Sequence, residues 1–370
     1  MKSIPFFDYS ALFQENSQEL TKIFRNVSSR GAFIMQDDLV KFEENLVKYT
    51  NVKYAVGVAN ATDAMQLLLK AGGISSGDEV IFCSHTMVAT ASAIAFTGAT
   101  PVPVDVGKDH MIDVNCIEAA ITPRTKAIMP TQLNGRMSNM DEILRIAKKH
   151  NLQIYEDSAQ ALGSKFKGQS AGSFGIGGCI SFYPAKVLGC FGDGGAVLTN
   201  DKSIYNKVKL LRDHGRGEDG SVSVWGYNSR LDNLQAAILN FFFQTYDKTI
   251  ERRRAIATLY HENLKDQEGI FLPPPPNSTG NYFDIYQNYE IEVDRRDDLK
   301  KCLANNGVGT LLQWGGKAVH EFRELGFSQS LPVTEKVMRN SLMLPLNMTI
   351  TNDEIFFISE KIKSFLNAKN

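Results

Sequence analysis

The sequence predicts an α/β protein with a large, mostly parallel sheet covered by helices, followed by a smaller α+β domain. The first observation is a regular alternation of short apolar strands and helical segments in the first half of the chain. Such alternation is typical of parallel sheets, whose strands are joined by crossover helices. The second observation is a shorter mixed series of strands and helices near the C-terminal end. We therefore expect two domains, residues 1–250 and residues 251–370.

The elements of the first domain follow from the spacing of apolar residues. Helices are expected where apolar residues recur every three or four positions, and strands where short apolar runs lie between turn signals. The expected strands are 54–58, 80–82, 100–105, 127–130, 152–155 and 195–199, and the expected helices are 37–50, 61–69, 89–96, 140–150 and 201–212. Residues 229–265 are typical of one long helix or of a bent pair.

The second domain contains a rigid polyproline spacer, residues 273–276. After this spacer the pattern predicts strands at 289–293 and 309–313, and helices at 296–305, 335–340 and from Asn352 onward. This mixture indicates a small α+β domain.

Composition and charge exclude several classes of protein. The 370 residues are 43% hydrophobic and 22% charged, and 40 basic residues face 41 acidic ones. This balance gives no electrostatic reason to expect nucleic acid or an anionic membrane as a partner. The uncharged stretch 80–104 is long enough to cross a membrane. It contains His85, Gly98 and two prolines, however, and we interpret it as a buried β–α–β segment.

The cysteines indicate a reducing compartment. The five thiols, at positions 83, 116, 179, 190 and 302, form no CxxC pair and no cluster with histidine. We expect free thiols in a cytoplasmic protein, and no metal site of the zinc type. The N-terminal run reaches Asp8 too early for a secretory signal peptide.

Lys186 is the most informative residue. It ends an apolar, strand-like run and is followed by four glycines with a single charge among them, Asp193. A lysine that snorkels to the surface is the plain alternative, but glycines permit tight turns and close approach of backbone to a ligand. An amine in a dry pocket has a lowered pKa and attacks aldehydes. We therefore interpret Lys186 as a Schiff-base lysine.

Two strand ends supply candidate partners for this lysine. The segment 60–63 opens a helix after strand 54–58, and free N–H groups at a helix start suit a phosphate, although a simple N-cap is the alternative. Ser181 offers a hydroxyl near the lysine turn. Asp157 follows strand 152–155, at the edge where open α/β sheets bind ligands, and is suited to pair with a cationic ring nitrogen. An N-cap or a surface acid is the alternative there.

Together these residues specify more than any one of them. A lysine, a carboxylate and a phosphate cradle are the parts that a pyridoxal phosphate site needs. Asp157 would keep the ring nitrogen protonated, and Lys186 would move a proton at the substrate carbon. In 225–232, polar residues precede a long helix, and taken alone Asn228 or Ser229 is best interpreted as an N-cap.

In its sequence motifs the chain resembles the DegT/DnrJ/EryC1/StrS sugar aminotransferases, which are fold type I pyridoxal phosphate enzymes. The similar blocks run almost end to end and are 31–34 (GAFI), 60–64 (NATDA), 77–80 (GDEV), 98–105 (GATPVPVD), 156–160 (EDSAQ), 181–186 (SFYPAK), 226–232 (GYNSRLD) with 235–237 (QAA), and 344–346 (LPL).

The resemblance implies pyridoxal 5'-phosphate as cofactor and roles by position. Lys186 and Asp157 would be catalytic, and the further cofactor-binding residues would be Ala61, Thr62, Met87, Gln160, Ser181 and Asn228. Substrate-binding residues would be Phe33, His85, Tyr183, Gln313, Trp314 and His320. Asn228 would reach the phosphate in the neighbouring subunit, which implies a homodimer with shared active sites.

The resemblance also implies a reaction. We expect an amino group to pass from an amino acid, L-glutamate, to a keto group of a nucleotide-diphospho-keto-sugar, as in the synthesis of deoxyamino sugars and polysaccharides. The lysine loop is similar to that of members that aminate C-3. A C-4 keto-sugar, a small phosphorylated ketone and a non-catalytic pyridoxal phosphate-binding role stay open as alternatives.

Two positions depart from the family pattern. Met87 stands where the family places an aromatic residue over the cofactor ring; its thioether can still pack on a ring, and His85 is a possible substitute. Gln313 and Trp314 stand where the family often has His-Tyr-Pro. A dehydrating relative is disfavoured because Lys186 is present. A nicotinamide-binding Rossmann protein is disfavoured because no GxGxxG follows the first strand.

Overall fold

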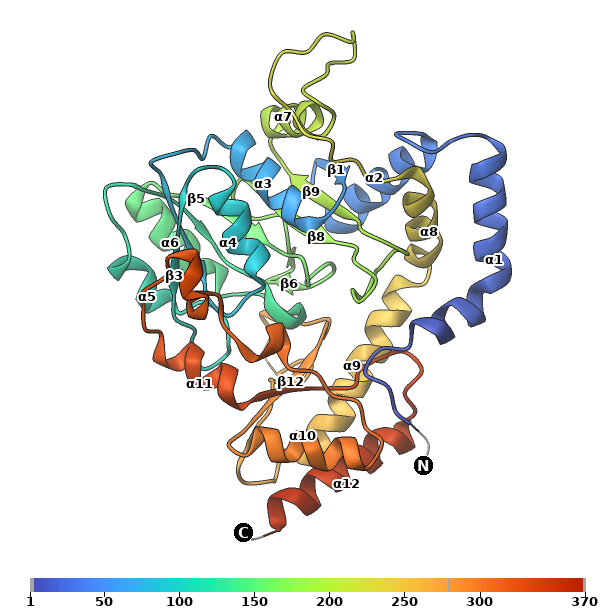
Figure 1. Ribbon diagram of the computed structural model, residues 1–370, viewed down its shortest axis with the longest axis vertical. Helices are drawn as coiled ribbons and strands as arrows, with labels where there is room; N and C mark the ends of the chain where they lie inside the picture. Colours follow the sequence, from blue (N-terminus) through green and yellow to red (C-terminus); the bar gives the residue numbers. More distant parts are fainter. Residues whose placement is uncertain (1–2, 279, 369–370) are drawn as a thin grey trace.

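A seven-stranded sheet forms the centre of the protein, described here by a computed structural model of residues 3–278 and 280–368 (Figure 1). Met1, Lys2, Thr279, Lys369 and Asn370 lie outside the described residues. The strand order is β1-β9-β8-β5-β4-β2-β3. The strands are β1 (Tyr54–Val58), β2 (Glu79–Cys83), β3 (Thr100–Val104), β4 (Thr125–Met129), β5 (Gln153–Asp157), β8 (Gly177–Ser181) and β9 (Gly195–Thr199).

Strand direction brings most strand ends to one edge of this sheet. Strand β2 is parallel to β3 and β4, β4 is parallel to β5, and β5 is parallel to β8. Only β9 runs the other way, antiparallel to both β1 and β8. The prediction of a mostly parallel sheet is therefore confirmed. The carboxyl ends of β1, β2, β3, β4, β5 and β8 share one edge, together with the amino end of β9.

Helices cover both faces of the sheet, and successive residues of its central strands are therefore buried on both sides. On one face Val56, Phe82 and Tyr155 pack with helices α3 (Ala61–Ala71) and α4 (Val88–Ala95). On the other, Ile154 packs with α5 (Val114–Ala119) and α6 (Met140–His150), while Ala55 packs with α2 (Asp37–Thr50) and α8 (Asn233–Phe243). Helix α7 (Lys202–Arg212) follows β9, and α1 (Tyr9–Ser29) lies alongside α8 (Figure 1).

A second core lies below the first in Figure 1 and is built around a three-stranded antiparallel sheet, β10-β12-β13. Its elements are α9 (Tyr246–Leu264), β10 (Ile270–Phe271), β12 (Tyr289–Val293), α10 (Arg296–Asn305), β13 (Ser341–Leu344) and α12 (Asn352–Asn367). Helix α9 joins the two cores, since Ile250 packs in the first and Ile256 in the second. The expected boundary after residue 250 falls within α9.

The remaining elements connect the two cores. Helix α11 (Pro332–Asn340) returns to the large sheet, where Val337 belongs to the same buried cluster as Val104 of β3, and Thr334 donates a hydrogen bond of 2.6 Å to Asp105. A small sheet joins β11 (Tyr282–Phe283) to β6 (Lys165–Phe166) and β7 (Gln169–Ser170). The short 3-10 helices are η1 (Leu133–Gly135), η2 (Gln313–Gly316), η3 (Val319–Glu321) and η4 (Arg323–Leu325).

Two expectations need correction. The expected strand 309–313 forms only one bridge, between Leu311 and Met343, because the chain turns sharply at Trp314 and Gly315, whose φ angles are 52° and 70°. The expected helix 335–340 begins earlier, at Pro332. Of the two alternatives for 229–265, the bent pair is found, as α8 and α9.

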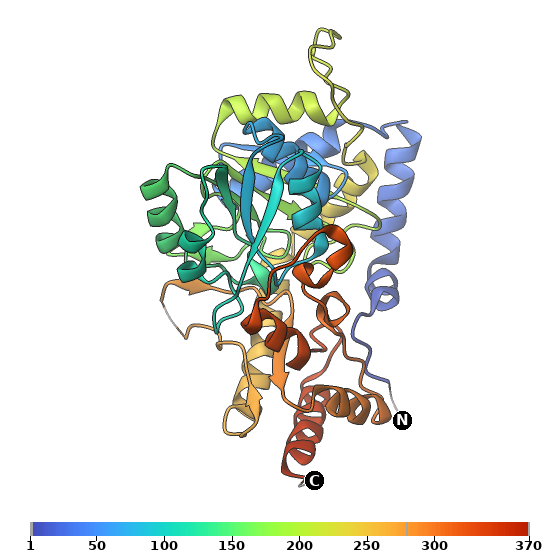
Figure 2. The same cartoon turned by 60° about the vertical axis from the view of Figure 1, so that its left-hand side comes forward.

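Between α7 and α8 the chain leaves the body of the protein as a long loop (Figures 1 and 2). Antiparallel bridges between Asp213 and Asn228 and between Arg216 and Val222 hold it together. Trp225 near its end is 98% exposed. The uncharged stretch 80–104 is β2, α4 and β3, as expected, and no helix of the described residues has the length and apolar character to cross a bilayer.

Candidate active site

The amino end of α3 meets the edge of the sheet at Gly195. In β9, Gly195 pairs with Val58 on one side and with Ser181 on the other. A Cβ atom on Gly195 would lie 2.4 Å from the carbonyl carbon of Asn60, so only glycine lets the helix start approach the strands this closely. The structure therefore brings Ser181 and Ala61 to one place.

The first turn of α3 presents free N–H groups at this edge. The Asn60 side chain caps the helix by accepting a hydrogen bond of 2.8 Å from the N–H of Asp63. The N–H groups of Ala61 and Thr62 have no acceptor among the described residues, as is normal for the first turn of a helix. A helix start of this kind binds an anion, and phosphate in particular.

Asp157 ends β5 and is 4% exposed. Its Oδ2 accepts a hydrogen bond of 2.6 Å from the Thr90 hydroxyl, which is itself 2.8 Å from the Thr86 hydroxyl. Burial raises the pKa of this carboxyl, and the bonds from Thr90 and the Ala159 N–H oppose that rise. The carboxylate form of Asp157 therefore needs a cation beside it.

Neighbouring Glu156 points to the other side of β5. Its carboxylate accepts hydrogen bonds of 2.7 Å from both the Gln132 amide and the Phe174 N–H. Burial raises the pKa of Glu156 to about 7. The alternation of side chains along a strand thus separates two adjacent acids, and only Asp157 faces the lysine.

Lys186 lies in the turn after β8 and is half-buried. Burial lowers the pKa of its amine to about 8, and the negative charge of Asp157 acts in the opposite direction. The Gln287 side chain holds the turn on both sides of the lysine. It donates a hydrogen bond of 2.8 Å to the carbonyl of Ala185 and accepts one of 2.9 Å from the N–H of Val187.

A cavity of about 140 Å³ opens beside this turn. Phe7, Tyr9, Arg253 and Asn288 line it together with Lys186, whereas Asp157, Thr62 and Ser181 do not. The cavity therefore adjoins the candidate site at the strand edge without containing the helix start or the buried carboxylate.

Polar residues form a network on one side of the site. Gln160 accepts a hydrogen bond of 2.8 Å from the N–H of Asn134. The Asn134 side chain accepts one of 3.1 Å from Gln313 and donates one of 3.0 Å to Glu290. Gln313 and the indole N–H of Trp314 are buried, and the Gln313 oxygen and that N–H have no partner among the described residues.

The other predicted site residues are more dispersed. Met87 at the start of α4, Tyr183 in the lysine loop and Phe33 beside the start of α8 are all exposed, and so is Asn228 in the long loop. His320 has no exposed surface: it binds the Ser84 hydroxyl at 2.7 Å and approaches Glu335 at 3.4 Å. That position suits the support of the Ser84–His85 turn better than direct contact with a substrate.

Several residues of the site are absent from the sequence-based prediction. Thr90 donates a hydrogen bond to the Asp157 side chain, and Gln287 bonds the backbone beside Lys186. Asn134 connects Gln160 with Gln313. Nothing local distinguishes an amide or hydroxyl side chain of this kind. Gln287 lies 100 residues from Val187, which it contacts.

Taken as a group, these residues are the parts that a pyridoxal phosphate site of a fold type I enzyme needs. Asp157 is a buried carboxylate that lacks a strong cationic partner, Lys186 is an amine with a lowered pKa, and the start of α3 has free N–H groups for a phosphate. The residues present fit the cofactor.

Comparison with known proteins gives the family. Residues 14–363 match the model of the DegT/DnrJ/EryC1/StrS aminotransferase family, and the chain belongs to it. The chain is 36% identical over 98% of each chain to a protein of Geobacillus stearothermophilus named pleiotropic regulatory protein. It is 35% identical to the dTDP-3-amino-3,4,6-trideoxy-alpha-D-glucose transaminase of Streptomyces venezuelae, over 98% of this chain and 96% of the relative.

A third relative and a solved structure agree with this placement. The UDP-N-acetyl-3-dehydro-alpha-D-glucosamine 3-aminotransferase of Acidithiobacillus ferrooxidans is 36% identical over 99% of each chain. The crystal structure of S. venezuelae DesV with a ketimine intermediate has a TM-score of 0.95 and 34% identity, covering 100% of both chains. The protein is therefore a pyridoxal phosphate-dependent aminotransferase, and the predictions of fold, enzyme class and cofactor are confirmed.

Proposed function

We propose that the protein transfers an amino group from L-glutamate to the C-3 keto group of a nucleotide-diphospho-keto-sugar. The observation that carries the catalytic part is the pairing of Lys186, whose amine has a pKa lowered to about 8, with the buried carboxylate of Asp157. The sugar part rests on two relatives at 35% and 36% identity, both named for 3-amino or 3-dehydro nucleotide sugars.

The roles proposed for the cofactor-binding residues follow their positions. The N–H groups of Ala61 and Thr62 and the hydroxyl of Ser181 bind the phosphate. Asp157 pairs with the protonated ring nitrogen, which supplies the cation that its buried carboxylate lacks. Gln160 lies near the ring oxygen, and Met87 packs on the ring through its thioether.

Lys186 has two tasks in this proposal. Its neutral amine holds the cofactor aldehyde covalently until an amine substrate displaces it. It then carries a proton at Nζ between the substrate carbon and the cofactor. When bound, pyridoxal phosphate supplies the electron sink for that carbon. The two hydrogen bonds from Gln287 to the backbone on either side keep the amine in position for both tasks.

The same positions serve both half-reactions of a ping-pong cycle. The amino-acid donor and the keto-sugar acceptor would bind in turn, and Lys186 would move the proton for each of them. We place the sugar against the polar side of the site, where Gln313 and Trp314 supply buried polar groups without a full set of partners. Tyr183 stands at the exposed margin.

The spectrum of the cofactor tests the catalytic part. We expect wild-type protein to show the absorbance of lysine-bound cofactor and L-glutamate to bleach it. K186A should lose the lysine-bound absorbance and about 10²–10⁴-fold or more of the turnover. A wild-type spectrum that glutamate leaves unchanged contradicts the proposal. The substrate is tested with ¹⁵N-glutamate and a set of nucleotide keto-sugars, with mass spectrometry of the products.

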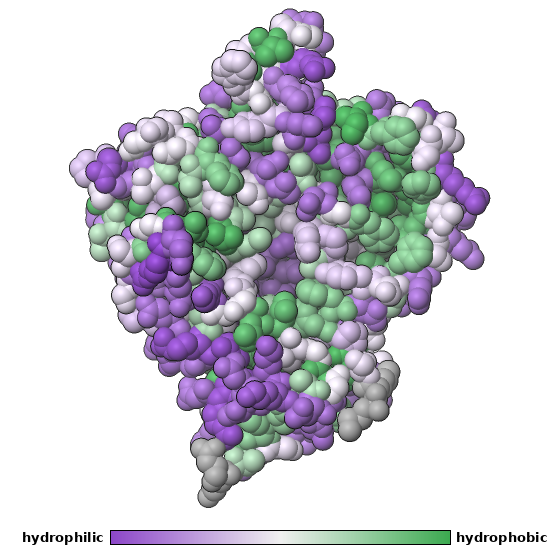
Figure 3. Space-filling model, in the orientation of Figure 1, coloured by the Kyte–Doolittle hydropathy of each residue, from purple (hydrophilic) through white to green (hydrophobic). Residues whose placement is uncertain are grey.

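We also propose a homodimer in which each active site receives Asn228 from the partner subunit. Three features support it: Asn228 is exposed on the projecting loop, Trp225 beside it is 98% exposed, and large apolar side chains around the lysine loop are uncovered. Figure 3 shows hydrophobic side chains gathered over α8 and around the hollow in the middle of this face. Uncovered apolar surface of this kind marks an interface.

Mixing two inactive variants tests the shared site. K186A lacks the lysine and N228A lacks the phosphate contact, so a mixed dimer has one intact site. If subunits exchange at random, half of the dimers are mixed, and we expect about a quarter of the wild-type activity. Mixed protein with no more activity than either variant alone contradicts shared sites.

The thiols bear on the compartment in which the protein works. All five cysteines are free, which supports a reducing cytoplasm as the compartment.

A further inference from the structure

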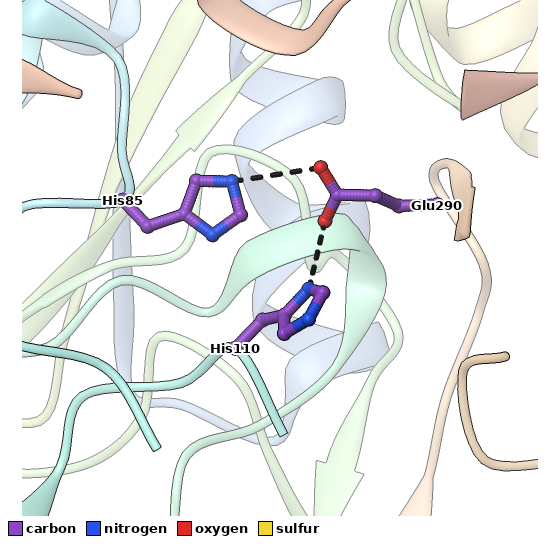
Figure 4. A group of neighbouring side chains, drawn as sticks. All are labelled: His85, His110 and Glu290. Atoms are coloured by element: carbon purple, nitrogen blue, oxygen red, sulfur yellow. Dashed lines mark hydrogen bonds and ion pairs between the residues drawn. The ribbon is translucent and has the colours of Figure 1, made fainter. Parts of the chain in front are cut away.

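Three buried side chains from distant parts of the chain converge beside the active site (Figure 4). His85 follows β2, His110 follows β3, and Glu290 lies on β12 of the smaller sheet. They are 0%, 6% and 3% exposed. One ligand atom from each lies within 4.8 Å of the others. The sequence contains no local cluster of metal ligands, and only the fold brings these residues together.

The distances suit a small metal ion. His85 Nε2 lies 3.5 Å from Glu290 Oε1, and His110 Nδ1 lies 3.1 Å from Glu290 Oε2. Zinc holds nitrogen and oxygen ligands at about 2.0–2.2 Å in a tetrahedron, so neighbouring ligand atoms are about 3.3–3.6 Å apart. The two observed separations, each to a different oxygen of Glu290, lie within about 0.2 Å of that range. One ligand atom of each histidine lies within 4.8 Å of the other, which is wider, so binding would draw the histidines together.

Two buried atoms without a hydrogen bond face each other between these residues. His85 Nε2 and Glu290 Oε1 share only the long contact of 3.5 Å and make no hydrogen bond with the described residues, and His85 Nδ1 makes none either. A buried polar atom without a partner costs free energy. A cation between these two atoms would satisfy both.

The residues around the cluster are arranged as they are around metal ligands. His110 Nε2 lies 2.9 Å from Glu292 Oε1, which leaves Nδ1 to face the cluster. A ligand histidine usually gives its other ring N–H to a carboxylate in this way. The Asn134 amide orients Glu290 by donating to Oε2 at 3.0 Å. Glu290 and Glu292 are two residues apart on β12 and so share one face.

We propose that His85, His110 and Glu290 bind one divalent transition-metal ion of the zinc type, with Glu292 as a positioning residue. Two neutral imidazoles and a carboxylate are ligands that zinc prefers, and the charges of Glu290 and Glu292 balance the dication. A cavity of about 40 Å³ lies beside two of the ligands, His110 and Glu290, and is large enough to hold a water.

The bound ion would clamp the two cores of the protein together. His85 and His110 belong to loops at the ligand-binding edge of the large sheet, whereas Glu290 belongs to the central strand of the small one. Asn134 contacts both Glu290 and Gln160, so the clamp adjoins the proposed cofactor site. The inference stands independently of the substrate proposed above.

The competing arrangement is an ion pair without metal. Burial lowers the pKa of His110, but Glu290 and Glu292 raise it to about 9 in net, so His110 without a metal is a cation between two carboxylates. Metal binding must displace that proton. The experiment therefore has to distinguish a bound metal from a protonated histidine.

Metal analysis of the holoenzyme makes this distinction. Protein treated with a chelator is dialysed against zinc and then against buffer, and bound zinc is measured by mass spectrometry. We expect about one zinc per chain in wild type and in H150Q, a control that changes another histidine beside a glutamate, Glu118. E290Q should retain none. E292Q, which keeps all three ligands, should lower the affinity roughly 10–100-fold.

A cobalt titration needs no variant and guards against misfolding of E290Q. Co²⁺ in a site with few ligands gives visible d–d absorbance, and we expect that absorbance to saturate at one equivalent and to be abolished by zinc. Each variant is compared at equal pyridoxal phosphate content, because the cofactor itself binds metals. Wild type without bound zinc overturns the proposal, and so does equal zinc in wild type and E290Q.

Discussion

The reactivity of Lys186 in the cofactor-free enzyme should depend on pH in a way that the structure determines. Burial lowers the pKa of the amine to about 8, whereas an ordinary lysine has a pKa of about 10.4. At pH 8 about half of the Lys186 amines are then neutral, compared with about 0.4% for an ordinary lysine. We therefore expect Lys186 to offer about a hundredfold more neutral amine at that pH.

The assay measures this amine directly. Cofactor-free protein is labelled briefly with a small aldehyde and a reductant at pH 6–11, and the peptide that contains Lys186 is quantified by mass spectrometry. N-acetyl-lysine labelled in the same tubes corrects for the pH dependence of the reagent. The labelling rate of Lys186 should level off above an inflection near pH 8, while that of the standard continues to rise.

A charge change at Asp157 gives the sign test. The Asp157 carboxylate raises the pKa of Lys186, so D157N should move the inflection to lower pH. D141N, which removes a surface carboxylate paired with Lys167, should leave it in place. An inflection above pH 10, or a shift to higher pH in D157N, refutes the reasoning.

The same shift links stability to pH. Between pH 8 and about 10.4 the unfolded chain binds a proton at this lysine that the folded cofactor-free protein does not hold. This group therefore makes the free energy of unfolding rise with pH across that window.

Two further changes test the cofactor cradle. G195A would place a Cβ 2.4 Å from the Asn60 carbonyl carbon in a strand held on both sides, so we expect it to lower the free energy of unfolding by about 1–3 kcal/mol and to reduce cofactor occupancy. G280A, with nothing within 4 Å of the new Cβ, is the control; urea unfolding and cofactor absorbance measure both, and equal effects contradict the packing argument. T90V removes the 2.6 Å donor to Asp157, so the pKa of that carboxyl should rise and the acid limb of the kcat–pH profile should move to higher pH. T90S keeps the hydroxyl and should show the wild-type profile. A T90V profile equal to that of the wild type contradicts the role of this hydrogen bond.

Elements with strong local signals were predictable from the sequence. The helix expected at 140–150 is found at Met140–His150 because local residues mark both ends: the Asn139 side chain caps the first turn, and Asn151 adopts a φ of 52° after the last. By contrast, α1 was not predicted, and the strand expected at 309–313 is replaced by a turn at Trp314.

The candidate site divides in the same way. Lys186 and Asp157 stand out locally, as a lysine in an apolar, glycine-rich run and an acid at a strand end. Gln287, Asn134 and Glu290 do not, because their roles depend on partners 100 or more residues away. The resemblance to the family identified the cofactor. It could do so from the sequence alone because each segment on which it rests is short and contiguous.

The sequence by itself determined the α/β class, the mostly parallel sheet and the lysine–carboxylate pair. These follow from patterns among residues within a few positions of one another, such as short apolar runs, helix caps and the turns that glycine permits. Only the tertiary structure decided that Gly195 admits the start of α3 to the strand edge, that Gln287 holds the lysine turn, and that His85, His110 and Glu290 share one buried space. The physical reason is that a hydrogen bond or a coordination site requires atoms within a few ångströms. The number of residues between two groups does not fix the distance between their atoms. That distance is set only when the two cores pack.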